Sequence, residues 1–383
     1  MPKKLKIIRT STVPTSLDTF CQYTLRHLSE KYEVVAVSSP DRVLDEIARR
    51  EGVRTVAVPM SRPISPLKDL VSLVRLVAVF LRERPDMVHS ITPKAGLLCM
   101  MAAWLCRVPV RVHTFTGLVF PTSQGFKRKV LMLTDWITCA CATHVVPEGR
   151  GVMDDLKCYG ITRKPMSVLG YGNVRGVDMN HYSRTAEVMG EAQALRRTDV
   201  FTFVFVGRIV RDKGVEELVE AFELLQAKRP QVRLVLVGYF EQNLDPVSED
   251  TLRKIKGNNS IECAGAQKDV RPWYAASDAL VLPSYREGFP NVVLEGGAMG
   301  LPSIVTDING SREIVTDGYN GLIVKAHNAM MLYDAMLRCV DSPDMVARMA
   351  QTARGVIAER YDKQFVEKCL FDYYDEILQK RKD

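Results

Sequence analysis

A short segment in the second half of the chain combines two basic side chains with a glycine turn. Arg208 and Lys213 lie between Gly207 and Gly214, after a strongly β-forming run and before a helical pattern. Gly207 lets the backbone turn sharply at the strand end, and a guanidinium fork and an ammonium group both bind phosphate oxygens well. The start of the next helix adds unpaired N–H groups and the positive end of its dipole. This segment predicts a diphosphate site, with a solvated basic loop as the alternative.

A second segment carries two carboxylates that could bind hydroxyl groups. Glu287 follows a predicted strand, and Glu295 lies about one turn into the next helix. Carboxylates accept hydrogen bonds from neighbouring hydroxyls, so this pair suits a sugar and a ribose. Gly288 and Pro290 between them form a tight turn whose N–H groups can face an anion. A capping glutamate followed by a surface glutamate is the alternative, and the presence of the basic segment at 207–214 in the same half of the chain disfavours it.

Strand-forming and helical patterns alternate along the whole chain, and several strands are continuous apolar runs that suit a parallel sheet buried on both faces. In the first half we expect strands at 5–9, 33–37, 54–58, 86–89, 110–114, 144–147 and 166–169, and helices at 17–29, 66–84 and 94–106. In the second half we expect strands at 201–206, 234–237, 260–263, 279–282, 303–305 and 322–324, and a last helix at 362–380. The alternation predicts an α/β fold of two doubly wound, Rossmann-like domains, 1–170 and 171–361, facing an interdomain cleft.

The composition disfavours several classes of protein. The net charge of +7 comes without a zinc-finger spacing, an aromatic RNA-binding pattern or a dense basic run, so we expect no nucleic-acid partner. The six histidines lack H-x-x-x-H spacing and the nine cysteines form no C-x-x-C pair, so we expect no metal and no disulfide framework. The first apolar run is too short for a signal peptide, and none is long enough to span a membrane. We expect a cytoplasmic protein that is soluble or peripheral on a membrane.

The two segments and the last helix together resemble the retaining glycosyltransferases of family 4, which have the GT-B type fold. The likeness is carried by G-R-x-x-x-x-K-G at 207–214 and by E-G-F-P-N-x-x-x-E at 287–295. It covers the whole chain and is more specific in the second half. The resemblance implies that 171–361 bind a nucleotide-sugar donor, that 1–170 bind the acceptor, and that the helix within 362–383 returns to the first domain.

The same resemblance implies roles for single residues of the two segments. Arg208 and Lys213 would hold the donor diphosphate, while Glu287 would lie beside the donor sugar. Glu295 would bind the nucleotide ribose. The backbone that lines the sugar and phosphates would come from Gly207, Gly288, Phe289, Pro290, Asn291 and Val292.

The first half resembles transferases of capsule, O-antigen and related bacterial glycan assembly, through H-S-I-T-P-K-A-G at 89–96 and R-V-H-T-F-T-G at 111–117. Such enzymes commonly use a UDP-sugar and act on sugars linked to undecaprenyl diphosphate, so the resemblance implies a UDP-sugar donor and a lipid-linked or oligosaccharide acceptor. His113 matches a position where the family often has a catalytic or donor-sugar histidine. A structural histidine is the alternative.

One stretch departs from the family. Many members have a Gly-Gly turn after the first strand, where the backbone approaches donor and acceptor, whereas this chain has T-S-T-V-P-T-S at 10–16. The hydroxyl groups of this stretch could serve the same phosphates or sugar. The candidate acceptor contacts are Thr12, Ser16, Lys94 and Arg111.

No enzymic nucleophile stands out for a retaining transfer, since the resemblance places Glu287 against donor hydroxyls. A front-face displacement is therefore expected, in which the departing diphosphate takes the acceptor proton while Arg208 and Lys213 stabilise its growing charge. No D-x-D motif occurs, and we expect no metal and no cofactor. Other functions remain open: a nucleotide-sugar epimerase or a phosphorylase of the same fold, and a non-catalytic nucleotide-sugar-binding protein.

Two stretches of the first half mix cations with apolar residues, as helices that lie on an anionic membrane do. Residues 66–84 carry four cations among many Leu and Val, and 126–136 begin with Lys127, Arg128 and Lys129. The alternative for 66–84 is that all its apolar residues pack in the core. The basic triplet favours 126–136 as the membrane contact, on the inner face of the cell membrane. The oligomeric state and the choice between hexose and N-acetylhexosamine stay open.

Overall fold

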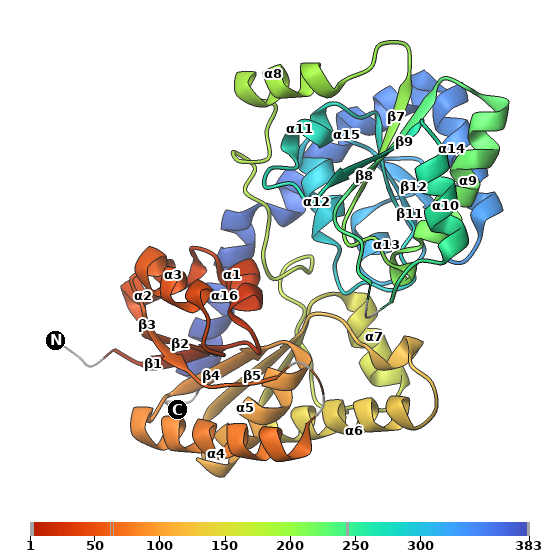
Figure 1. The fold of residues 1–383 in the computed structure, drawn as a ribbon. Coiled ribbons are helices and arrows are strands. Elements are labelled where there is room, and N and C mark those ends of the chain that lie inside the picture. Colours follow the sequence, from red (N-terminus) through yellow and green to blue (C-terminus); the bar gives the residue numbers. More distant parts are fainter. Residues whose placement is uncertain (1–3, 62, 64, 243–244, 381–383) are drawn as a thin grey trace. The chain divides into compact units, whose positions relative to one another are not determined.

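The computed structural model describes residues 4–61, 63, 65–242 and 245–380, and the chain forms two compact units (Figure 1). Unit 1 comprises Met1–Gly176 and Gln364–Asp383, and unit 2 comprises Val177–Lys363. Residues 1–3 and 381–383, which belong to the expected ranges 1–170 and 362–383, lie outside the described part of the chain.

Unit 1 is built on a parallel sheet of six strands in the order β3-β2-β1-β4-β5-β6. The strands are β1 (Lys6–Thr10), β2 (Glu33–Ser38), β3 (Arg54–Ala57), β4 (Met87–Ile91), β5 (Val110–Phe115) and β6 (His144–Pro147). Because the order reverses beside β1, the carboxyl ends of β1 and β4 form the switch point at which doubly wound sheets bind ligands. The predicted doubly wound fold is confirmed for this half.

Helices cover both faces of the sheet of unit 1 (Figure 1). One face packs against α1 (Pro14–Cys21), α2 (Thr24–Lys31), α3 (Arg42–Glu51) and α16 (Lys363–Gln379). The other packs against α4 (Pro66–Glu83), α5 (Pro93–Leu105), α6 (Gly125–Cys141) and α7 (Arg150–Cys158), with the 3-10 turn η1 (Phe120–Thr122) before α6. Helix α5 contacts both α4 and α6, so these three form one layer.

Unit 2 repeats the architecture with the strand order β12-β11-β10-β7-β8-β9, all parallel. Its strands are β7 (Phe201–Val206), β8 (Val232–Val237), β9 (Ile261–Gly265), β10 (Ala279–Leu282), β11 (Ser303–Thr306) and β12 (Gly321–Val324). Its helices are α8 (Ala186–Leu195), η2 (Arg211–Lys213), α9 (Val215–Lys228), α10 (Glu249–Gly257), α11 (Arg271–Ala275), α12 (Asn291–Ala298), α13 (Ser311–Ile314), α14 (Ala329–Asp341) and α15 (Pro343–Tyr361). The second predicted doubly wound sheet is therefore also confirmed.

The last helix of the chain, α16, is fastened to unit 1 through buried polar contacts. The Tyr374 hydroxyl and His89 Nδ1 both bind Arg9 Nη1, and the His89 contact is 3.0 Å long. Burial holds the pKa of His89 well below its usual value, so the ring stays neutral beside the guanidinium. On the same helix, Glu367 accepts a hydrogen bond from the Thr24 hydroxyl at 2.7 Å.

Two expectations about unit 1 are wrong. Residues 166–169 form no strand, because only Met166 bridges to Val145 of β6 before Gly170, with φ +56°, turns the chain. The single helix expected at 17–29 is two helices, α1 and α2, separated at Tyr23, whose φ is +63°. The buried carboxylate of Glu51 accepts hydrogen bonds from the backbone N–H groups of Tyr23 and Arg26, and this starts a second helix.

The amphipathic stretches of unit 1 expose much of their apolar surface. On α4, Leu76 and Phe80 face the core, but Leu67 is 82% exposed and Val74 is 62% exposed. On α6, Phe126 is 81% exposed. The alternative that all apolar residues of 66–84 belong to the core is therefore wrong. Within the described residues, no helix is long and apolar enough to cross a membrane.

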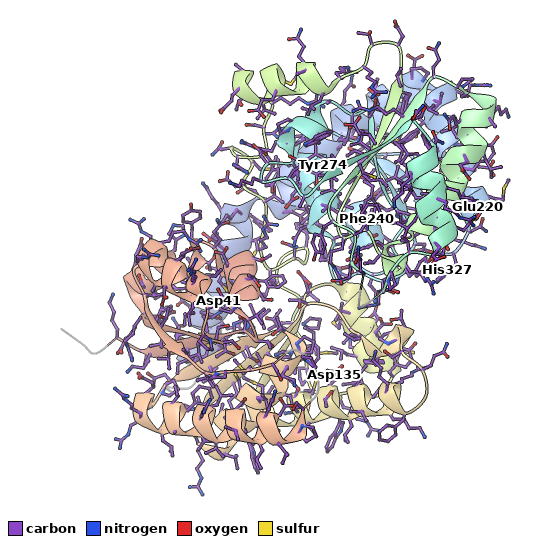
Figure 2. The ribbon with its side chains drawn as sticks, in the orientation of Figure 1. Asp41, Asp135, Glu220, Phe240, Tyr274 and His327 are labelled. Carbon is purple, nitrogen blue, oxygen red and sulfur yellow. The ribbon has the colours of Figure 1, made fainter. Side chains whose placement is uncertain are left out.

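We expect Asp135→Asn to stabilise the protein at alkaline pH and to have little effect in acid. Asp135, labelled in Figure 2, is buried on α6, and burial raises its pKa from 3.8 to about 7. Between these values the folded chain binds a proton that the unfolded chain has lost, so stability falls as the pH rises. Removing the carboxylate should raise the free energy of unfolding by roughly 1–4 kcal/mol above pH 7. Urea titrations across this pH range measure the effect.

The exposed acid Asp154 on α7 provides the matched control, since Asp154→Asn should change stability little at any pH. A stabilisation by Asp135→Asn that is independent of pH would contradict the assigned pKa.

Candidate functional site

In unit 2 the two segments singled out in the sequence lie against each other. The Lys213 ammonium group forms an ion pair with Glu287, and their side chains are 22% and 14% exposed. Beside them, Arg286 pairs with Asp212 at 2.6 Å, and the Tyr285 N–H donates to the Asp212 carbonyl at 2.9 Å. The loop after β7 and the loop after β10 therefore form one surface at the carboxyl ends of neighbouring strands.

Two glycines allow the loops to approach this closely. Gly214, with φ +68°, caps α9, and a β-carbon there would collide with the Pro283 carbonyl. Gly310, with φ +74°, precedes α13, and a β-carbon there would collide with the Gly288 carbonyl and lie 2.9 Å from Pro290 Cδ. Only glycine fits such positions without displacing backbone. The turn that ends in Gly310 is thus part of the candidate site, although no motif in the sequence indicated it.

The two basic residues differ in how they are held. Arg208 is exposed and makes no hydrogen bond or ion pair with any described residue, whereas Lys213 is held by Glu287. Gly207, with φ +151°, follows β7 and sets the start of the loop. An anion binding here would meet an exposed guanidinium and a lysine that can exchange its carboxylate partner. This arrangement suits phosphate binding.

In the loop from Gly288 to Val292, Phe289 and Pro290 are buried, whereas the other three residues are partly exposed. Phe289 is only 5% exposed and packs against Tyr361 with the two rings tilted and their centroids 5.4 Å apart. Asn291 starts α12 after Pro290, which offers no side-chain cap to the first N–H groups. Asn291 and Val292 are partly exposed, so the first N–H groups of α12 are candidate donors to an anion.

Glu295 lies deeper than the sequence indicates. It is 7% exposed on α12 and accepts a 3.4 Å hydrogen bond from the hydroxyl of Tyr274, which is labelled in Figure 2. A ribose could reach it only through the narrow exposed fraction of its carboxylate. Its predicted contact with the ribose stays a prediction.

Three further side chains extend the site, and the sequence patterns missed them. The Tyr285 hydroxyl binds both carboxylate oxygens of Glu217, at 2.7 and 2.6 Å. The Tyr285 ring stacks on His327, which follows β12 (Figure 2), with centroids 3.7 Å apart. Burial and the neighbouring carboxylate raise the pKa of Tyr285, so its hydroxyl stays protonated. These residues are far apart in sequence, and no spacing could have joined them.

In unit 1, His113 lies in β5 and is 1% exposed. Its Nδ1 shares a 2.8 Å hydrogen bond with the Ser90 hydroxyl. Burial lowers its pKa to about 3, so the ring is neutral at physiological pH and cannot act as an imidazolium. Its imidazole packs over Gly96 of α5, where a β-carbon would collide with the ring. The absence of a side chain at Gly96 thus lets α5 pack directly against the His113 ring.

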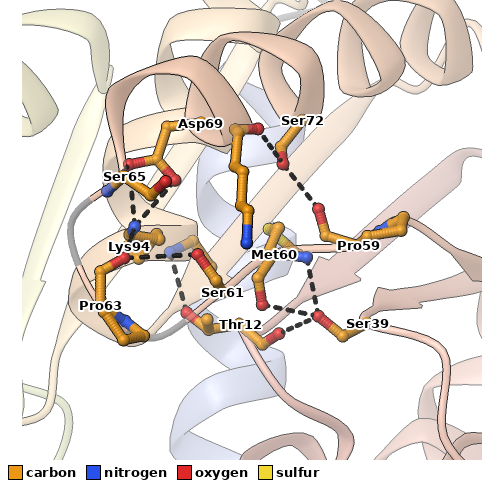
Figure 3. A network of polar contacts seen from close by, with 12 residues as sticks. Thr12, Ser39, Pro59, Met60, Ser61, Pro63, Ser65, Asp69, Ser72 and Lys94 are labelled. Atoms are coloured by element: carbon orange, nitrogen blue, oxygen red, sulfur yellow. Dashed lines mark hydrogen bonds and ion pairs between the residues drawn. The ribbon is translucent and has the colours of Figure 1, made fainter.

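Three candidate acceptor residues lie at or just beyond the carboxyl ends of β1 and β4. The Thr12 hydroxyl contacts the Thr92 hydroxyl at 2.8 Å and accepts from the Ala95 N–H at 3.1 Å, so it fastens β1 to the start of α5. Lys94 binds both carboxylate oxygens of Asp69 at 2.8 Å (Figure 3). Ser16, in the first turn of α1, is partly exposed.

Arg111 does not belong with these residues, and we correct its assignment. It lies near the amino end of β5, whereas Thr12 and Lys94 follow the carboxyl ends of β1 and β4. Its guanidinium donates to the carbonyls of Cys141 and Val108, both at 2.6 Å. Arg111 therefore lies at the opposite end of the strands from the other acceptor candidates, as its position at the start of the expected strand 110–114 also indicates.

Comparison with known proteins identifies the two halves. Residues 18–172 match the family described as glycosyl transferase 4-like domain, and residues 191–356 match the family described as glycosyl transferases group 1. Both halves of the chain are thus glycosyltransferase domains. The second match contains all the residues that the sequence predicts to bind the donor, from Gly207 to Glu295.

Several relatives match over most of their length. A capsular polysaccharide biosynthesis glycosyltransferase of Staphylococcus aureus, CapM, is 27% identical over 98% of both chains. A UDP-Gal:alpha-D-GlcNAc-diphosphoundecaprenol alpha-1,3-galactosyltransferase of Escherichia coli is 26% identical over 86% of both chains. Among solved structures, Anabaena HepE in complex with UDP and glucose has a TM-score of 0.80 at 18% identity, covering 97% of this chain and 100% of that one. The glycosyltransferase therefore has the GT-B fold.

We expect Gly96→Ala to destabilise the glycosyltransferase and to displace His113. A glycine-to-alanine change inside a helix normally stabilises it by about 1 kcal/mol, but here the new methyl group would collide with the imidazole. The free energy of unfolding should therefore fall by roughly 1–3 kcal/mol, which is the usual cost of overpacking. Thermal unfolding and the NMR signals of the His113 ring measure the two effects.

Gly355→Ala is the control, because Gly355 is exposed on α15 and a β-carbon there meets no atom within 4 Å. That variant should be slightly more stable than the wild type. Equal stabilisation by both substitutions would show that α5 does not confine His113.

Proposed function

We propose that this glycosyltransferase moves a sugar from a UDP-sugar to an undecaprenyl-diphosphate-linked sugar, with retention at the anomeric carbon. The observation that carries the proposal is the junction of the two loops of unit 2, where Lys213 pairs with Glu287 and the exposed Arg208 belongs to the same loop as Lys213. The acceptor class is supported by the E. coli relative named above, and the donor nucleotide by the UDP complex of HepE. Unit 2 would bind the donor and unit 1 the acceptor.

The donor would enter the site by replacing the internal partner of Lys213. Its diphosphate would take the lysine from Glu287, and Arg208 would fold onto the same oxygens. Glu287, released from the ion pair, would then accept hydrogen bonds from sugar hydroxyls. The first N–H groups of α12 would bind the remaining phosphate oxygen.

The transfer itself would be a front-face displacement. The bond from the anomeric carbon to the diphosphate oxygen breaks while the acceptor hydroxyl attacks from the same side. The departing diphosphate takes the acceptor proton, and Arg208 and Lys213 stabilise the negative charge that it gains. Since two cations supply this charge, we propose that no divalent metal is needed. His113 would serve as a neutral hydrogen-bonding group, as its pKa of about 3 requires.

We expect Arg208→Ala and Lys213→Ala each to lower turnover by about 10²-fold, because each removes positive charge from the leaving group. The fold should survive, since Arg208 is exposed and Lys213 is partly exposed. Turnover of UDP-sugar with a diphosphate-linked acceptor is measured with and without EDTA. Arg253→Ala on α10, an exposed cation outside the site, is the control.

Wild-type turnover in either variant, with intact circular dichroism, would reject the site. Two competing functions have separate signatures in the same assay. An epimerase would release UDP without any acceptor, and a non-catalytic binding protein would bind UDP-sugar without consuming it.

We also propose that the layer formed by α4, α5 and α6 lies on an anionic membrane. These helices contain three acids: Asp69 is paired with Lys94, while Glu83 and Asp135 are buried. Their exposed surface therefore carries no free carboxylate but many cations and apolar side chains. The exposed apolar residues are Leu67, Leu70, Val71, Val74, Leu81, Trp104, Leu105, Phe126, Leu133 and Trp136. Such a surface combines the two attractions that hold a protein at a lipid interface.

We expect the wild-type protein to sediment with anionic liposomes at low salt and less at high salt, because each nearby cation contributes about 1 kcal/mol. Changing Lys127, Arg128 and Lys129 together to Glu should weaken this binding strongly. The control changes three exposed cations of unit 2, Arg253, Lys256 and Lys268, to Glu, which alters net charge equally. Equal binding by both variants would reject the α6 triplet as a membrane contact.

A further inference from the structure

A groove of about 520 Å³ opens in unit 1 beside the start of α4. Its walls are the loop after β2, the loop after β3 and one side of α4. Its volume falls in the range of roughly 300–1,000 Å³ that is usual for ligand sites. Most of its surface is apolar, and the carbon atoms come mainly from Pro40, Pro59, Met60, Leu67 and Val71. No step of the transfer described above uses this groove.

The Ser39 and Ser72 hydroxyls in the walls are already bound to backbone groups of the walls (Figure 3). The Ser39 hydroxyl donates to the Met60 carbonyl and accepts from the Met60 N–H, both at 2.9 Å. The Ser72 hydroxyl donates to the Pro59 carbonyl at 2.6 Å. A sugar or nucleobase placed here would lose hydrogen bonds to water without gaining others, whereas a hydrocarbon would lose nothing. The groove therefore suits an apolar chain.

Two cations stand at the rim of the groove. Lys68 and Arg75 line it from α4, and both are exposed. They lie about 10 Å apart along the helix axis, within reach of long side chains converging on one anionic group. The nearest acid of α4, Asp69, is bound to Lys94 and cannot neutralise them. An apolar groove with two unneutralised cations fits an amphiphile whose head group is negatively charged.

The groove also connects two surfaces that the proposed reaction needs. On one side, the Ser39 hydroxyl contacts the Thr12 carbonyl at 2.8 Å, in the loop expected to meet the acceptor. On the other side, Leu67 and Val71, 82% and 50% exposed, belong to the outer apolar surface of α4. A chain that leaves a membrane at α4 would therefore lead directly to the carboxyl edge of the sheet.

We propose that this groove binds the hydrocarbon chain next to the phosphate of a polyprenyl-phosphate-type acceptor, with Lys68 and Arg75 on the phosphate oxygens. The inference rests on the proposed function for the identity of the acceptor, and it adds the place where the lipid is held. The chain would pack on Met60, Leu67 and Val71. Lipid length and charge, in addition to the sugar, would then select the acceptor.

The first test measures binding without any donor. The full-length protein is irradiated with a diazirine-bearing farnesyl phosphate, and the labelled peptides are mapped. We expect labelling within residues 59–75 and about a tenfold loss in Val71→Asp, which places a charge in the groove. Leu81→Asp is the matched control, because Leu81 is 58% exposed on the same helix but does not line the groove. Circular dichroism confirms that each variant is folded.

The second test separates head group, chain and bulk lipid. Lys68→Gln combined with Arg75→Gln should reduce labelling by farnesyl phosphate to the level given by an uncharged farnesol probe. Unlabelled polyprenyl phosphate should compete, and phosphatidylglycerol at the same concentration should not. Labelling elsewhere, equal labelling of the Val71 and Leu81 variants, or equal competition by phosphatidylglycerol would overturn the inference.

Kinetics distinguish a failure of this inference from a failure of the proposed function. Val71→Asp should raise KM about tenfold for a long-chain diphosphate acceptor and leave KM unchanged for a water-soluble short-chain analogue. A wild-type protein that is labelled in the groove but transfers no sugar would reject the proposed transfer alone. A wild-type protein that transfers sugar to both acceptors with equal KM would reject the lipid groove alone.

Discussion

The candidate site of unit 2 depends on two places where the backbone of one loop lies so close to another loop that only glycine fits. Gly214 meets the Pro283 carbonyl and Gly310 meets the Gly288 carbonyl, and both glycines have positive φ angles. Because backbone fixes the loops, the charged side chains on them need not be rigid. Lys213 can leave Glu287 for a phosphate without opening the loop, since removing that ion pair leaves the glycine contacts in place. Binding of a diphosphate would then cost an exchange of partners and not a refolding of the site.

The candidate acceptor site of unit 1 differs, because most of its polar side chains already bind partners within unit 1. His113 is neutral and confined over Gly96, while Lys94 is committed to Asp69 and the Thr12 hydroxyl to the start of α5. Few side chains at the carboxyl edge of this sheet are therefore available to bind a charged sugar. An acceptor recognised here would depend on shape, backbone groups and apolar contact, which agrees with a lipid-linked acceptor better than with a free phosphorylated sugar.

The sequence predicted the order of strands and helices well, because buried parallel strands read as continuous apolar runs. It also selected the segments of Lys213 and Glu287, which the structure pairs at the carboxyl ends of the neighbouring strands β7 and β10. What it could not predict depends on partners distant in the chain. The break at Tyr23 requires the carboxylate of Glu51, and the engagement of Lys94 requires Asp69. Arg111 is a different case, because the expected strand 110–114 already places it near the amino end of β5, away from the other acceptor candidates.

Helix α4 shows most clearly why pattern alone is insufficient. Its apolar residues surround the helix, so a period of 3.6 does not reveal which row meets the sheet. In the structure Leu76 and Phe80 take the inner row, and Leu67, Leu70 and Val74 are left outside. A helix that faces water normally carries charged residues of both signs on its outer side. The exposed charged residues of α4 are all positive. Exposed apolar side chains and an excess of positive charge are both unfavourable in water, and both are favourable at an anionic lipid surface. Contact with such a surface would therefore explain both features of α4.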